Sequence, residues 1–144
     1  MKTLLLNLFL VLSTVQLSAQ QLTEDDFLGS WKAVDVRLIP EMIVGFDEDG
    51  KKKIEQVKDG FVDAVFSFKS NGDFTIEFSD RIPEFMKELE FLNNKKWKIV
   101  DGETVGVGTE EDGYSHMRII VRSEQDQKFF ALFETPFIMK VVEQ

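Results

Sequence analysis

Histidine, the side chain best suited to proton transfer near neutral pH, occurs once in this chain, at His116. The sequence contains no cysteine, which excludes a thiol nucleophile and cysteine-based metal sites. In the segment GYSHMRIIVR, the apolar residues Met117, Ile119 and Val121 alternate with polar ones. This alternation predicts that His116 lies on the solvated face of a strand. We therefore predict no catalytic residue and a protein that is not an enzyme.

Carboxylates are abundant, and a suitably spaced pair of them is enough for glycoside hydrolysis. None of the 26 acidic residues, however, falls on a face that the apolar pattern assigns to the interior. The segment DEDGKKKIE spaces Asp47 and Asp49 like the first ligands of a calcium loop, but Lys51 stands where a third oxygen ligand is needed. We interpret this segment as a hairpin turn, and we predict neither a metal nor a cofactor.

Apolar side chains are the residues that could form a binding site. They alternate with polar residues in FVDAVFSFK and DFTIEF, and the Asn71-Gly72 turn would bring the two apolar faces together. Such faces line a cavity for a small apolar ligand, or they fill a small barrel completely, and the sequence leaves both alternatives open. The residues predicted to bind a ligand are Phe66, Phe68, Phe74, Ile76, Phe78, Phe85, Met86, Trp97 and Met117.

Turn chemistry divides the chain into short strands. Asn-Gly and Asp-Gly dipeptides tolerate the positive φ angles of tight hairpins, and they recur at intervals that suit consecutive antiparallel strands. These dipeptides are Asp49-Gly50, Asp59-Gly60, Asn71-Gly72, Asp101-Gly102 and Asp112-Gly113. The strands expected from this pattern are 30–38, 42–47, 51–58, 61–69, 73–79, 95–100, 103–108, 114–122, 127–134 and 137–142. The last two are so uniformly apolar that we expect both of their faces to be covered.

One segment, RIPEFMKELEFLNN, predicts a helix over 83–92. Pro83 suits a first helical position, and apolar residues follow at helical spacing. We expect this helix to cover the mouth of the barrel, with Phe85 and Met86 facing the interior.

The elements together predict an all-β protein, an antiparallel meander barrel of about eight to ten strands with one short helix. Thr23 and Asp26 are spaced as a capping pair for a short N-terminal 3₁₀ turn. This turn would carry Phe27 and Leu28 inward, and Trp31 would plug the floor of the barrel.

The segment FLGSWKAV, followed by FSFKSNGDFTIEF and KKWKIVDGETV, resembles the bacterial secreted lipocalin-like domain family. The resemblance covers most of the chain after residue 19. It implies a calycin-like barrel whose first strand begins with Gly-x-Trp, and in some members a small apolar ligand. It also implies an arginine late in the barrel that packs across Trp31. No arginine follows Arg122, so Arg122 or Lys140 would have to take that place.

Residues 1–19 have the pattern of a secretory signal peptide, with Lys2, an apolar segment and a cleavage site after Ala19. We therefore expect a single domain over 20–144, located in the periplasm or outside the cell. The net charge of −9 disfavours nucleic acid as a partner, and no apolar segment after the signal peptide is long enough for membrane insertion.

The function expected from these features is the binding of a small apolar or amphipathic molecule inside the barrel. The alternative is a secreted protein-interaction module with a filled barrel and no small-molecule ligand. The oligomeric state does not follow from the sequence.

Overall fold

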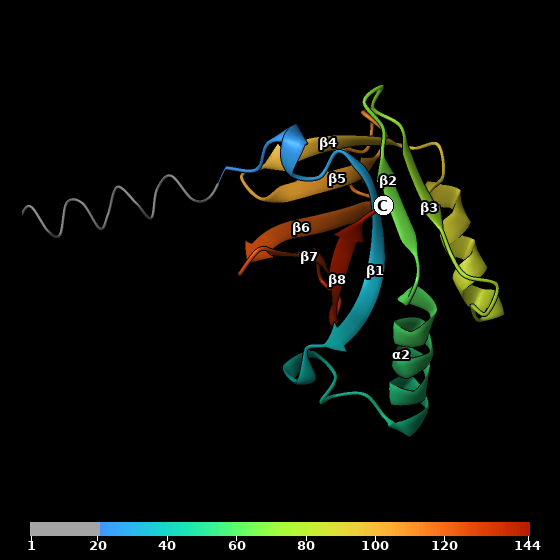
Figure 1. The fold of residues 1–144 in the computed structure, drawn as a ribbon. Helices are drawn as coiled ribbons and strands as arrows, with labels where there is room; N and C mark the ends of the chain where they lie inside the picture. The colour runs from blue at the N-terminus through green and yellow to red at the C-terminus, as the bar shows by residue number, and fades with distance from the viewer. Residues whose placement is uncertain (1–20) are drawn as a thin grey trace, which may run out of the picture.

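Eight antiparallel strands wrap into a nearly closed barrel in the computed structural model, which describes residues 21–144 (Figure 1). The strands are β1 (Gly29–Leu38), β2 (Val65–Phe68), β3 (Phe74–Glu77), β4 (Lys96–Asp101), β5 (Thr104–Gly108), β6 (Met117–Glu124), β7 (Gln127–Leu132) and β8 (Phe137–Glu143). Their order in the sheet is β3-β2-β1-β8-β7-β6-β5-β4. The predicted all-β meander barrel is therefore confirmed. The predicted signal peptide lies outside the described residues.

The gap between β3 and β4 is the one place where consecutive strands do not pair. The Phe74 N–H donates to the Lys95 carbonyl at 2.8 Å, and the Ile76 N–H donates to the Asn93 side-chain oxygen at 2.7 Å. A 3₁₀ helix, η3 (Glu84–Leu92), lies alongside β3 in this gap (Figure 1). These contacts satisfy backbone donors that would otherwise be exposed at a sheet edge.

A 14-residue helix, α2 (Glu48–Phe61), connects β1 to β2 after a short 3₁₀ turn, η2 (Pro40–Met42). The prediction of strands over 42–47 and 51–58 is therefore wrong, and so is the prediction of hairpin turns at their Asp-Gly dipeptides. The Asp47 side chain caps the helix by accepting a hydrogen bond from the Gly50 N–H at 2.8 Å.

Two further sequence features favour the helix. Glu48 and Asp49 lie in its first turn, where negative charge is stabilised by the helix dipole. Ile54, Val57 and Phe61 recur at helical spacing and pack against the core. The acidic residues of this segment thus belong to a helix N-terminus and not to a tight turn.

The hairpin between β2 and β3 has the predicted register but a different turn. Phe66 pairs with Ile76, and Phe68 pairs with Phe74, so all four side chains are buried on one side. We expect positive φ at both residues of an Asn-Gly hairpin turn, but only Gly72 of the Asn71-Gly72 pair has a positive φ, of 92°, so this expectation is wrong. The loop contains more than the two residues of a tight hairpin turn. A loop of this kind needs only one residue in the left-handed region, and here that residue is Gly72.

The floor of the barrel is built by the N-terminal 3₁₀ turn η1 (Glu24–Asp26), as predicted. The Asp26 carboxylate accepts the Thr23 N–H at 2.8 Å, and the turn directs Phe27 into the barrel, where it is fully buried. Trp31, 8% exposed, donates its indole N–H to the Phe27 carbonyl at 2.5 Å. The Phe27 ring meets Trp97 edge to face at 5.1 Å between centroids.

A cation does cover Trp31, but it comes from a residue that the sequence did not indicate. The Lys128 ammonium, at the start of β7, lies 4.6 Å from the Trp31 ring centroid, so the expectation of Arg122 or Lys140 at this place is wrong. Burial lowers the pKa of Lys128, and the nearby carboxylates of Asp26 and Glu143 oppose this effect. The contact closes the outer side of the floor.

Candidate functional site

The half of the barrel nearest the floor is filled by aromatic rings. Phe66, Phe68, Phe74 and Phe130 are fully buried. Phe68 lies 5.3 Å from Phe74 and 5.9 Å from Phe130 between ring centroids. Rings at these distances are in direct packing contact, so this half has no room for a ligand. The predicted site residues Phe66, Phe68, Phe74 and Trp97 thus belong to the packed core.

The other end of the barrel contains a pocket of about 540 Å³, which we call the mouth pocket. It lies at the start of β8, whereas the floor lies near the end of that strand. Helix α2, β3, η3, the start of β6 and the turn between β7 and β8 all contribute to it. Its lining residues are Val57, Phe61, Ile76, Leu89, Phe91, Leu92, Ser115, His116, Met117, Arg118, Leu132, Phe133, Glu134, Thr135 and Phe137.

Two of the predicted site residues line the mouth pocket, namely Ile76 and Met117. Phe78 is half-buried and packs against Phe61, with 5.8 Å between ring centroids. The sequence interpretation missed the contributions of α2, because its segment was predicted as a strand. The spacing of Val57 and Phe61, four residues apart, is the feature of the sequence that indicates a helix here.

Helix η3 forms a wall of the pocket with a different face from the one predicted. A 3₁₀ helix has three residues per turn, so Met86, Leu89 and Leu92 align on one side and Phe85 does not. Met86 is buried and packs against Gly60 of α2, while Leu89 and Leu92 line the pocket. Phe85 is 41% exposed and lies outside the pocket. The expectation that Phe85 faces the interior is therefore wrong, whereas Met86 is buried as expected, although it does not line the pocket. Helix η3 does lie at the mouth of the barrel, as expected.

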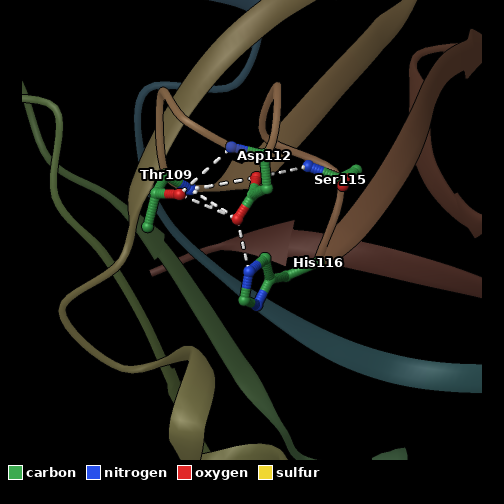
Figure 2. Close-up of polar contacts among 4 residues, drawn as sticks. All are labelled: Thr109, Asp112, Ser115 and His116. Carbon is green, nitrogen blue, oxygen red and sulfur yellow. Dashed lines mark hydrogen bonds and ion pairs between the residues drawn. The ribbon is translucent and has the colours of Figure 1, made fainter.

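The polar side of the mouth pocket is the loop between β5 and β6, shown in Figure 2. Asp112 organises this loop, since its carboxylate accepts the Thr109 hydroxyl at 2.8 Å and the Ser115 N–H at 3.0 Å. His116 Nε2 contacts the same carboxylate. The His116 ring also lies 5.5 Å from the Phe91 ring of η3, which places the histidine at the rim between the loop and the helix.

The pKa of Asp112 is lowered to about 2. Partial burial favours the neutral acid, but hydrogen bonds from Ser115 and Thr109 and the charge of His116 together outweigh it. The carboxylate is therefore ionised at neutral pH. Its role in this geometry is to fix the loop and hold His116.

The stability that Asp112 contributes is expected to depend on pH. Its folded-state pKa of about 2 lies below the ordinary value of 3.8, so the contribution is complete above pH 3.8 and is lost as the pH falls through 2. Thermal melts of the wild type and Asp112→Asn should differ at pH 7 and converge near pH 2. Glu111→Gln is the matched control in the same loop. A melting difference that stays constant over this range would contradict the assignment.

Two glycines of β5 allow the loop to lie directly on the strand. A Cβ atom at Gly106 would lie 2.5 Å from the Tyr114 carbonyl oxygen, and one at Gly108 would lie 2.7 Å from Asp112 Oδ1. Both distances are shorter than the non-bonded contacts that Cβ atoms make in protein structures. The position of His116 at the rim therefore depends on the absence of side chains in β5.

No protein-family model, curated protein or solved structure matches this chain. Within residues 21–144, no helix is both long enough and apolar enough to cross a membrane. The architecture alone therefore defines the class of protein. It is a nearly closed eight-stranded antiparallel barrel, which is compatible with a calycin-like fold.

Proposed function

We propose that this protein binds a small apolar or amphipathic molecule in the mouth pocket. The observation that carries the proposal is the pocket itself, whose volume of about 540 Å³ falls within the range of small-molecule sites. Apolar side chains from α2, β3, η3 and β6 converge on it, and the packed aromatic rings beneath it provide a rigid base.

The distribution of polar groups favours an amphipathic ligand. Leu132 and Phe137 are almost fully buried in the lining, whereas His116 and Glu134 lie at the rim. A ligand would place its apolar part against the buried residues and its polar part near His116. This arrangement supports binding, because the buried lining would hold the apolar part of the ligand and His116, held by the Asp112 carboxylate, would lie near its polar part.

Membership of the lipocalin-like family and export through the signal peptide belong to the same proposal. The Gly-x-Trp at the start of β1, the 3₁₀ turn before it and the cation over Trp31 support the family. The N-terminal sequence pattern supports a location in the periplasm or outside the cell.

A filled interaction module is the second candidate function, and the packed aromatic rings near the floor favour it. The two candidates differ in whether the mouth pocket takes up a small molecule. Native mass spectrometry of protein purified from its own host would detect a retained ligand.

Binding can be tested directly with Nile red, a neutral apolar fluorophore. Met117→Trp fills the mouth pocket, and we expect it to weaken saturable Nile red binding by about tenfold or more, which corresponds to about 1.4 kcal/mol. Phe85→Trp adds the same ring on an exposed position of η3 outside the pocket, and it should bind as the wild type does. Thermal melts verify that both variants fold. Equal affinities in the two variants, or no saturable binding to the wild type, would overturn the proposal.

A further inference from the structure

The two ring nitrogens of His116 have different surroundings. Nε2 contacts the Asp112 carboxylate, whereas Nδ1 points away from that carboxylate (Figure 2). Among residues 21–144, the structure gives Nδ1 no hydrogen-bond partner. Because Asp112 is ionised and can only accept, a neutral imidazole at this place carries its proton on Nε2. Nδ1 is then a hydrogen-bond acceptor on a residue that lines the mouth pocket.

Charges of both signs border the mouth pocket. Arg118 is a cation among the lining residues, Glu134 is an acid among them, and Asp112 is a second acid in contact with His116. A ligand carboxylate would be repelled by Asp112 and Glu134, and a ligand ammonium would be repelled by Arg118. A neutral ligand avoids both costs. The polar group that suits His116 Nδ1 is therefore an uncharged donor, such as a hydroxyl group.

The mouth pocket is lined by aromatic rings from its rim to its buried part. Phe91 of η3 is 51% exposed and Phe133, between β7 and β8, is 50% exposed, although both line the pocket. The Phe91 ring lies 5.5 Å from the His116 ring between centroids. Further inside, the buried rings of Phe61 and Phe137 lie 5.7 Å apart. Contacts between aromatic rings are favourable beyond the area that they bury, so this lining favours a ligand with an aromatic ring.

We propose that the ligand of the mouth pocket is a neutral aromatic molecule with a hydroxyl donor, of the phenol type. Its ring would cover the exposed parts of Phe91 and Phe133, and its hydroxyl would donate to His116 Nδ1. This inference rests on the proposed binding function and narrows the class of ligand.

Three matched probes separate the hydroxyl from the ring. Thymol carries both features, thymol methyl ether lacks the donor, and menthol has the same skeleton with a saturated ring. Displacement of Nile red at about pH 8, where histidine side chains are ordinarily neutral, gives the three affinities. We expect thymol to bind about threefold or more tightly than menthol, because only thymol can make the aromatic contacts.

Variants of the lining test each feature through the ratio of two affinities. His116→Phe keeps a ring at the rim but removes the acceptor, so the affinity of thymol relative to its methyl ether should fall by about fivefold or more. Phe91→Leu combined with Phe133→Leu should bring the affinities of thymol and menthol to about the same value. Phe85→Leu, at an exposed position of η3 outside the pocket, is the matched control and should change neither ratio. Each ratio compares two probes on one variant, so a general loss of stability does not alter it.

Two outcomes would overturn this ligand class and leave the proposed function intact. One is a ratio of thymol to methyl ether affinity that His116→Phe leaves unchanged. The other is binding of menthol to the wild type as tight as that of thymol, or tighter. The absence of saturable binding by Nile red and by all three probes would instead overturn the proposed function, and this inference with it.

Discussion

Replacement of Trp31 by alanine is expected to lower the free energy of unfolding by about 3–5 kcal/mol, the range found for other buried large aromatic residues. Trp31 is 8% exposed and contacts the Phe130 ring, and its indole N–H satisfies the Phe27 carbonyl. Alanine would remove all of these contacts and would leave Lys128 without its aromatic partner. Urea or guanidinium denaturation, analysed as a two-state transition, measures the difference.

Two further variants show whether the effect is specific to the floor. Trp31→Phe keeps most of the packing but loses the N–H donor, so it should cost about 1–3 kcal/mol. Phe85→Ala removes a large aromatic ring that is 41% exposed, and it should cost less than about 1 kcal/mol. If Trp31→Ala were no more costly than Phe85→Ala, the floor would not depend on the tryptophan.

The parts of the fold that the sequence predicts are those in which one local pattern determines the structure. The strict alternation from Phe66 to Phe78 fixes which side chains of β2 and β3 are buried, because a shift of one residue would place every ring in water. The Thr23 and Asp26 capping pair likewise acts within a few residues. The structure of such segments does not depend on how the rest of the chain folds.

The largest error concerns α2, where two local patterns compete. The Asp-Gly dipeptides at 49–50 and 59–60 are typical of turns, but the Asp47 cap and the spacing of the apolar residues indicate a helix. Packing favours the helix, since it places Val57 and Phe61 together against the core at the mouth of the barrel. A side chain at Gly60 would collide with Met86, which packs directly against this glycine.

The mouth pocket itself could not be predicted from the sequence, because its walls come from segments that are distant along the chain. Strand alternation indicates Ile76 and Met117, but the contribution of Leu132 and Phe137 depends on where β7 ends and β8 begins. The choice between a 3₁₀ and an α-helix in η3 also decides which side chains face the pocket. An α-helix has about 3.6 residues per turn and a 3₁₀ helix has three. Because of this difference, Phe85 lies in solvent instead of facing the interior.

Gly106→Ala is expected to have the next largest effect, a loss of about 1–3 kcal/mol in the free energy of unfolding, as for other overpacked sites. The added methyl group would lie 2.5 Å from the Tyr114 carbonyl oxygen, which belongs to the backbone and cannot rotate away. The loop would have to lift from β5, and His116 would move away from Phe91 at the rim of the mouth pocket. Denaturation measures the loss of stability, and the affinity for Nile red should fall as well.

Gly45→Ala is the matched control, because an added Cβ there meets no atom within 4 Å. It should change neither stability nor probe binding. The two readouts of Gly106→Ala also separate two roles of the loop. A loss of stability with unchanged Nile red affinity would mean that the loop supports the barrel without shaping the pocket. Unchanged stability would mean that the loop does not pack on β5 as described, and the position of His116 at the rim would then have no structural basis.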